Sequence, residues 1–343
     1  MQGCLSEPRE IGNREVREDR VGLRHTKVLT HGDGTMARMI PVVRRVAFPL
    51  LLTLLVLMAT GVRVAGSTGS DGTHTADPFP VGPGVVEVDF LGTPLKLHFY
   101  KPATYSGQRF ILVFHGASRT ASGYRDSASE MAEKFESLVV VPEFDLERFP
   151  NRTYQFGGVF REDGSFADPT EHTYAYVPLL VEYIRGREGD AEMAHTILGF
   201  SAGGQFVSRM AAFLDTDADR IIVTSPGSCI FPNREMRFGL GFGGLPQEWS
   251  NDGRIERFLA QPITIYIGTN DTEMGQLPTG DAYAQGVHRY SRNIRWFNEA
   301  MDLAYNEGWE FNWRLVIADG PGHSPPDMFN HPQTENALFG HRR

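Results

Sequence analysis

Ser201 lies in the pentapeptide Gly199–Gly203, whose G-x-S-x-G pattern sets a hydroxyl between two glycines. Residues 195–198 before it form a short, β-branched apolar run, which is typical of a buried parallel strand, and residues 204–210 after it have a helical pattern. A sharp turn from strand to helix exposes a serine hydroxyl and leaves room only for glycine two positions before and after. The context predicts a nucleophilic serine; a Gly/Ser turn between a core strand and a core helix is the alternative.

A serine nucleophile needs partners, because its hydroxyl is weak at neutral pH and requires a base, and the base requires a carboxylate that fixes its tautomer. Asp271 follows the apolar run 263–267, and His323 follows the apolar run 315–317. Both therefore lie at the carboxyl ends of expected strands, where the active sites of open sheets form. With Ser201 they give the chain order serine, acid, histidine. We expect Ser201 as nucleophile, His323 as base and Asp271 as acid.

Other residues compete for these roles. Asp271 could be a turn or cap residue, with Asp319 as the acid, and the base could be one of three other histidines: His172, His288 and His331. Asp319 lies only four residues before His323 on the same loop. His172 and His288 fall at an expected helix start and within an expected helix, away from strand ends. Position therefore favours Asp271 and His323.

The elements around these residues alternate between strands and helices. Two alternating runs around a turn, 85–90 and 95–100, predict an antiparallel hairpin. Further strands are expected at 110–114, 138–141, 196–200, 221–224, 263–267 and 313–317, and helices near 122–136, 173–186, 204–214 and 282–306. Strands separated by helices predict an α/β domain over 85–343 with a mostly parallel sheet. The long segment 228–262, rich in glycine, proline and aromatic residues, is expected to be a lid or pocket wall.

These motifs resemble those of the α/β-hydrolase superfamily over roughly residues 85–340. The motifs are His115-Gly116-Ala117 after the third strand, the pentapeptide around Ser201, Gly268–Asp271 and Gly320–His323. The resemblance implies a mostly parallel sheet of about eight strands, with helices on both faces and an antiparallel N-terminal hairpin.

A finer similarity, carried by an export signal, the His-Gly loop and Val141–Asp145, is to the secreted polyhydroxybutyrate depolymerase and feruloyl esterase branch. Members of that branch usually have a cysteine in the oxyanion loop and disulfides, which this sequence lacks. Their polymer and feruloyl substrates are therefore not carried over.

The resemblance also implies an oxyanion hole at the end of the third strand. Residues 110–114 lead into His115-Gly116-Ala117-Ser118, and we expect the backbone N–H groups of Ala117 and Ala202 to be its two donors. Each such donor lowers the barrier by about 3 kcal/mol. The ring of His115 is expected to be structural rather than to titrate.

The aromatic residues near Ser201 and in the long loops could line a substrate pocket or could pack the loops onto the sheet. The pocket candidates are Phe200, Tyr154, Phe231 and Trp249. No motif predicts a cofactor, since Gly239–Gly244 spells G-x-G-x-x-G without a preceding strand. No histidine and carboxylate cluster has the spacing of a zinc site, so no metal is expected.

The N-terminal part predicts export. Residues 46–62 are uncharged and apolar and follow three arginines, so 36–66 is expected to be a signal peptide, or else an N-terminal membrane anchor. Residues 1–35 would be an upstream mis-start or disordered, and residues 67–84 a flexible leader. Cys229 is then the one cysteine of the mature chain, so no internal disulfide is available. A formal charge of −9 argues against nucleic acid as a partner.

Together these features predict a secreted or periplasmic serine hydrolase that cleaves small or polymeric carboxylic esters through an acyl-enzyme. A peptidase or an acyltransferase remains an alternative, because fold and triad do not choose the acceptor. A non-catalytic exported binding protein on the same scaffold is a further alternative, although the intact triad argues against it. The natural ester and the oligomeric state do not follow from the sequence.

Overall fold

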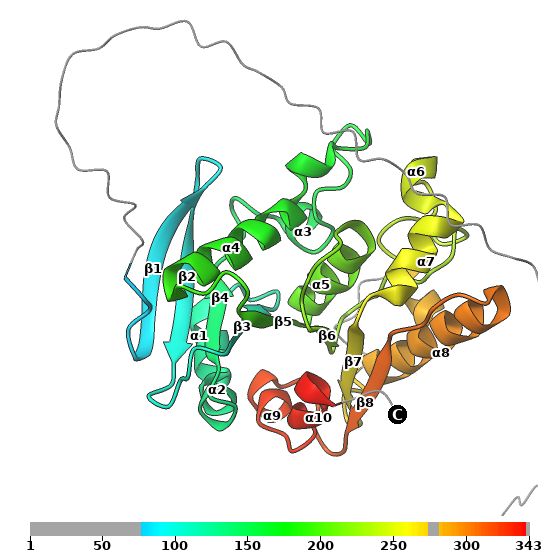
Figure 1. The fold of residues 1–343 in the computed structure, drawn as a ribbon. Coiled ribbons are helices and arrows are strands. Elements are labelled where there is room, and N and C mark those ends of the chain that lie inside the picture. Colours follow the sequence, from blue (N-terminus) through cyan, green and yellow to red (C-terminus); the bar gives the residue numbers. More distant parts are fainter. Residues whose placement is uncertain (1–76, 274–280, 341–343) are drawn as a thin grey trace, which may run out of the picture. The chain divides into compact units, whose positions relative to one another are not determined.

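The computed structural model describes residues 77–273 and 281–340, and within them the strands form one sheet with the order β1-β2-β4-β3-β5-β6-β7-β8 (Figure 1). The first two strands, β1 (Gly82–Phe90) and β2 (Thr93–Lys101), form the predicted hairpin, and β2 continues antiparallel to β4 (Leu138–Pro142). All later pairs are parallel. They join β3 (Arg109–Phe114), β5 (Ala194–Phe200), β6 (Arg220–Thr224), β7 (Ile263–Gly268) and β8 (Arg314–Ala318).

The sheet is covered by helices on both faces. One core cluster includes side chains from α4 (Tyr176–Glu188), α5 (Ala202–Phe213), α7 (Asp252–Ala260) and α8 (Arg289–Glu307). The other cluster includes side chains from α1 (Ala121–Ser127), α2 (Ser129–Lys134), α9 (Pro325–Phe329) and α10 (Thr334–Phe339). The α/β-hydrolase layout that the sequence resemblance implied is therefore confirmed.

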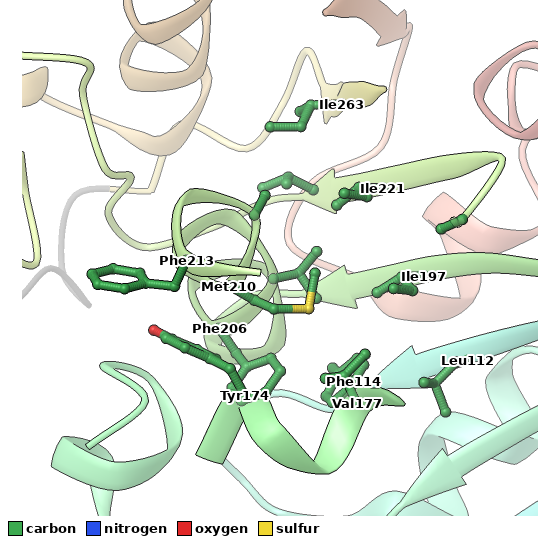
Figure 2. Packing of buried hydrophobic residues seen from close by; sticks show 14 of the residues in the cluster. Leu112, Phe114, Tyr174, Val177, Ile197, Phe206, Met210, Phe213, Ile221 and Ile263 are labelled. Carbon is green, nitrogen blue, oxygen red and sulfur yellow. The ribbon is translucent and has the colours of Figure 1, made fainter. Parts of the chain in front are cut away.

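The two clusters arise from the strand period of two, which sends alternate side chains to opposite faces. Phe114 and Ile197 pack against Phe206 and Met210 of α5, as Figure 2 shows. Val113 and Leu198, which adjoin them in sequence, belong to the second cluster. Burying a side chain of this size stabilises the fold by about 1.5–3 kcal/mol. Because β3 and β5 are covered on both faces, every residue after the first is buried and apolar residues predominate, which is why the strands were recognisable in the sequence.

Some helices differ from expectation. The stretch 122–136 forms two short helices, α1 and α2, that meet at Ala128. The stretch 282–306 begins as a short 3₁₀ helix, η3 (Asp281–Gln285), and α8 starts only at Arg289, because His288 caps it instead of lying inside it. The expected lid segment 228–262 contains two helices, α6 (Gln247–Ser250) and α7, and Asn251 caps α7 through its side chain.

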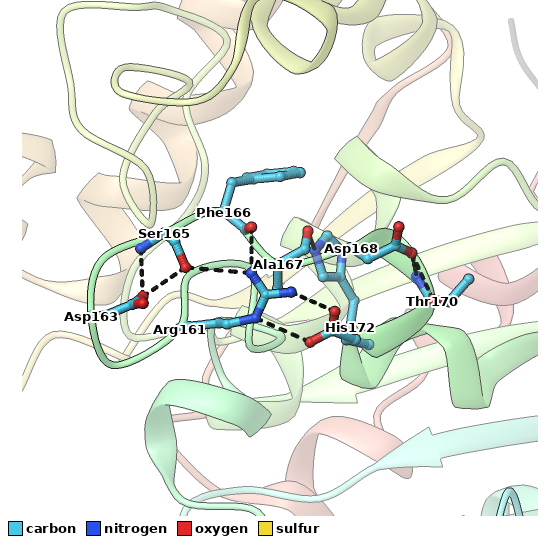
Figure 3. A network of polar contacts seen from close by, with 9 residues as sticks. Arg161, Asp163, Ser165, Phe166, Ala167, Asp168, Thr170 and His172 are labelled. Carbon is cyan, nitrogen blue, oxygen red and sulfur yellow. Dashed lines mark hydrogen bonds and ion pairs between the residues drawn. The ribbon is translucent and has the colours of Figure 1, made fainter.

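The long connection between β4 and α4 holds its own polar contacts (Figure 3). Arg161 donates hydrogen bonds to Glu171, to Ser165 and to the carbonyl of Phe166. The connection includes α3 (Asn151–Tyr154) and the 3₁₀ turns η1 (Pro169–Glu171) and η2 (Thr173–Ala175). The same connection contacts the loop after β3 through Tyr154, whose hydroxyl donates to the His115 carbonyl.

The segments expected at 1–35, at 36–66 and in most of the leader 67–84 lie outside the described residues. Within the described part of the chain, no helix has the length and apolar character needed to span a bilayer.

Candidate active site

Ser201 stands at the turn between β5 and α5. Its backbone has φ 57° and ψ −113°, a conformation that side-chain-bearing residues rarely adopt and that marks a strained turn. A Cβ on Gly199 would lie 2.2 Å from the Gly203 oxygen, and a Cβ on Gly203 would lie 2.0 Å from the Phe114 oxygen. The predicted requirement for glycine on both sides of Ser201 is confirmed.

The structure brings Ser201, His323 and Asp271 together. The distance from His323 Nε2 to Ser201 Oγ is 3.0 Å, and that from His323 Nδ1 to Asp271 Oδ2 is 3.1 Å. A carboxylate can only accept, so Nδ1 carries the hydrogen and Nε2 is free to accept the serine proton. Asp271 follows β7 and His323 follows β8, which explains why both were recognisable as strand-end residues.

The competing residues have other partners. Asp319 accepts a hydrogen bond from the Thr269 hydroxyl, and His331 lies 3.2 Å from the Asp319 carbonyl. His288 caps α8, and His172 lies 3.2 Å from the Ala167 carbonyl. Each of these four side chains therefore makes a local structural contact instead of a contact with Ser201.

Asp271 is fully buried and contacts more than His323. Arg289 Nη1 lies 3.3 Å from Asp271 Oδ1. Burial acts to raise the pKa of Asp271, but the hydrogen bond and charge of His323, the charge of Arg289 and the Ser225 hydroxyl outweigh it, so the pKa lies below its usual value. The carboxylate is thus charged at neutral pH.

Sequence reasoning missed Arg289, although a signal existed. Arg289, Arg292, Asn293 and Trp296 are buried at helical spacing, so two arginines lie on the face of α8 that turns toward the core. A charged residue on a buried helix face needs a partner, and Asp271 is that partner for Arg289.

The loop after β3 is held rigidly. His115 is buried, its Nε2 accepts the N–H of Phe144 at 3.1 Å, and its Nδ1 donates to the Gly116 carbonyl at 3.0 Å. Burial lowers the pKa of His115 to about 4, so the ring is neutral, as expected for a structural histidine. Tyr154 donates its hydroxyl to the His115 carbonyl at 2.8 Å, and the Arg119 guanidinium lies 4.2 Å from the Tyr154 ring centre.

The two expected oxyanion donors lie next to this loop and the turn at Ser201. Ala117 lines the hollow at Ser201. Ala202 is the first residue of α5, and the first N–H groups of a helix have no acceptor within the helix. Both positions are compatible with the expected role.

A hollow of about 430 Å³ opens beside Ser201. It is lined by small, hydroxyl-bearing and apolar residues: Ala117, Ser118, Thr120, Gly123, Tyr124, Ser127, Phe200, Ser201, His323, Pro325 and Pro326. Burial raises the pKa of Tyr124 to about 12, so its phenol is neutral. Among the described residues that line it there is no lysine or arginine.

The predicted pocket needs correction. Of its four aromatic candidates only Phe200 lines the hollow, because Tyr154 and Phe231 are fully buried in the core and Trp249 stacks on Phe213. The segment 228–262, expected as a lid or pocket wall, contributes no lining residue there. Its aromatic side chains instead pack against α5 and α7, which was the alternative that composition left open.

A larger hollow of about 550 Å³ lies between α4 and the residues after α5. Its charged lining consists of four acidic residues and one arginine: Glu182, Asp190, Asp215, Asp217 and Arg185. The lining residues that the structure describes include no serine, cysteine or histidine, so they offer no such nucleophile paired with a histidine base.

The strand order, the turn at Ser201 and 30% identity to a solved hydrolase place the chain in the α/β-hydrolase superfamily, and it is a serine hydrolase. That solved structure is LpqC, a poly(3-hydroxybutyrate) depolymerase from Bordetella parapertussis, with a TM-score of 0.67 over 73% of this chain and 88% of LpqC. Poly(aspartic acid) hydrolase-1 from Sphingomonas sp. KT-1 is 29% identical, with a TM-score of 0.67 over 74% of this chain and 96% of that chain. The similarity to the polyhydroxybutyrate depolymerase branch is therefore confirmed. No protein-family model matches the chain, and neither does any curated protein.

Proposed function

We propose that the protein hydrolyses carboxylic esters through an acyl-enzyme on Ser201. The observation that carries the proposal is the His323 ring, which lies within 3.1 Å of both Ser201 Oγ and Asp271 Oδ2. His323 would take the hydroxyl proton as Ser201 Oγ attacks the acyl carbon, and would give it to the leaving alkoxide. Water would then attack the acyl-enzyme by the same route and release the acid.

The remaining residues would assist this reaction. Asp271 would stabilise the imidazolium that forms on His323, since its carboxylate is buried and charged. The N–H groups of Ala117 and Ala202 would donate to the oxygen that becomes negative, at about 3 kcal/mol of barrier each.

The hollow at Ser201 favours a neutral acyl group. In the part of the chain that the structure describes, its lining offers hydroxyls and apolar surface but no lysine or arginine. LpqC is a poly(3-hydroxybutyrate) depolymerase, and poly(3-hydroxybutyrate) is a neutral polyester with short side groups. A neutral ester of this kind, small or polymeric, is the substrate that we propose.

A second candidate is amide hydrolysis in a polyanion, because the chain is 29% identical to poly(aspartic acid) hydrolase-1. Each residue of poly(aspartic acid) carries a carboxylate. The described lining residues include no lysine or arginine, and the formal charge is −9, so both features disfavour such a substrate. Matched ester and amide chromogenic substrates with the same acyl group would separate the two candidates, and added alcohols or amines would reveal acyl transfer.

Export is a further part of the proposal. It rests on the uncharged apolar residues 46–62 that follow three arginines. N-terminal sequencing of the protein recovered from the culture medium or periplasm of its host should find cleavage near residues 64–66. Recovery of the full-length chain from the membrane fraction would instead support an anchor.

The test of catalysis combines a fluorophosphonate probe with aryl ester hydrolysis. The probe should label Ser201, and both the adduct and ester hydrolysis should be lost, by at least about 10⁴-fold, in Ser201→Ala and His323→Ala. Ser208→Ala is the matched control, because Ser208 is a buried serine of α5 whose hydroxyl bonds the Gln205 carbonyl. Ester hydrolysis that survives in Ser201→Ala would refute the proposal.

A further inference from the structure

Asp271 carries two partners on its two oxygens. Oδ2 faces His323, which the reaction requires, and Oδ1 faces the guanidinium of Arg289 at 3.3 Å. The Arg289 side chain is 5% exposed and that of Asp271 is fully buried. A buried ion pair is costly to form, so the presence of this cation behind the carboxylate calls for a role.

Arg289 is anchored on a rigid element. It is the first residue of α8, whose start is fixed by a capping box between His288 and Ser291. The N–H of Tyr290 donates to the Asp271 carbonyl at 3.0 Å, so the backbone of the helix start is tied to the backbone of the acid loop. Helix α8 therefore holds the guanidinium at a fixed place relative to Asp271.

The charges around Asp271 come from several elements. Helix α8 supplies Arg289 and Arg292, and the loop after β8 supplies His323. Ser225, which follows β6, faces Asp271 with a neutral hydroxyl, while Cys229 and Tyr283 face Arg292. Of these charged groups, Arg289 is the one that pairs with Oδ1, which leaves Oδ2 facing His323.

We propose that Arg289 is a positioning residue of the triad: by holding Asp271 Oδ1, it orients the carboxylate so that Oδ2 accepts the hydrogen bond from His323 Nδ1. This inference rests on the proposed function of the triad. Arg289 acts through Asp271 and does not touch the reacting atoms.

The test is the separation of kcat from KM for an aryl ester. Arg289→Gln should lower kcat about tenfold while KM stays within twofold of the wild type, because the carboxylate loses the partner that orients it. Arg289→Lys keeps a cation at this position and should restore most of the lost kcat. Arg254→Gln is the control: Arg254 is buried on α7 against Trp249, so its loss should lower the unfolding temperature without lowering kcat.

A kcat in Arg289→Gln that stays within twofold of the wild type, or that falls equally in Arg289→Lys, would overturn the proposal. The NMR chemical shift of the His323 Nδ1 proton, which reports its hydrogen bond to Asp271, should change in Arg289→Gln and gives the same comparison without substrate. Failure of the proposed function, seen as no ester hydrolysis by the wild type, is thus distinguishable from failure of this inference.

A double variant keeps the proposal testable if Arg289→Gln does not fold. Asp271→Asn leaves the Arg289 cation without its partner, so Asp271→Asn/Arg289→Gln should unfold at a higher temperature than Asp271→Asn alone. A double variant that is no more stable than Asp271→Asn would show that the two side chains do not act as a pair.

Discussion

Replacing Gly203 by alanine adds one methyl group and tests how tightly the start of α5 packs against the end of β3. The Cβ of alanine would lie 2.0 Å from the Phe114 oxygen and 2.8 Å from the His115 oxygen, whereas real Cβ atoms essentially never come nearer than 3.0 Å. The end of β3 and the start of α5 would therefore have to separate by about 1 Å. Overpacking of this kind costs about 1–3 kcal/mol of unfolding free energy, or about 2–10 °C in unfolding temperature for a domain of this size.

The same movement should lower activity far more than stability. Ala117 follows β3 and Ala202 begins α5, so the two expected oxyanion donors would move apart. A displacement of about 1 Å costs about 100-fold in rate, so kcat/KM of Gly203→Ala for an aryl ester should fall by that factor.

Gly186→Ala provides the matched control for this measurement. Gly186 is also a helical glycine, but a Cβ there meets nothing within 4 Å. Its replacement should stabilise the protein by about 0.4–1 kcal/mol and leave kcat/KM unchanged. Thermal unfolding followed by circular dichroism gives both stabilities. Wild-type kcat/KM in Gly203→Ala would refute the steric reasoning.

Two further predictions concern stability. Burial lowers the pKa of His115 and of His195 from 6.5 to about 4. Between these pH values the unfolded chain binds protons that the folded chain does not. The free energy of unfolding should therefore fall by a few kcal/mol as the pH drops from about 6.5 to 4. Urea unfolding at several pH values should show this slope, and His195→Gln should flatten it; an equal slope in both proteins would contradict the assignment. Arg209 is fully buried and donates to the carbonyls of Gly239 and Gln155 and to Ser228, so Arg209→Met should cost about 3 kcal/mol or more, seen as a lower urea midpoint. A midpoint within error of the wild type would show that those acceptors find other partners.

The sequence predicted the strands and the strand-end residues because both are encoded locally. Central strands such as β5 and β7 are buried on both faces, so they appear as short apolar runs with β-branched residues. Asp271 and His323 follow such runs directly, and parallel strands bring their carboxyl ends to one edge. That is why residues 122 positions apart, Ser201 and His323, were placed together without a structure.

The pocket wall could not be predicted in this way. An aromatic residue in a long loop has the same composition whether it faces a ligand or the sheet. For Tyr154 the outcome depends on a hydrogen bond to the His115 carbonyl, 39 residues away in sequence. For Trp249 it depends on stacking against Phe213 of α5. Helix α7 was missed for a related reason, since the glycine and proline content of 228–262 concealed its amphipathic run.

The first residue of a helix could also not be predicted from the sequence where a side-chain hydrogen bond determines it. His288 accepts the N–H of Ser291 and so begins α8 at Arg289, although the periodic pattern extends further back. The start of α8 at this residue matters for the site, because it places Arg289 beside Asp271.

The contacts that hold the loop carrying Ala117 should affect how fast inhibitors associate. Tyr154, Phe144 and the guanidinium of Arg119 hold this loop through contacts made within the protein itself. A boronic acid or phosphonate inhibitor therefore meets a surface that does not have to rearrange first, and its association should be a single step whose observed rate rises linearly with concentration. Ordering of the protein chain should therefore reduce the binding free energy of the inhibitor only slightly. A wall of this kind selects acyl groups by size, so activity should end abruptly at one chain length instead of declining gradually along an ester series.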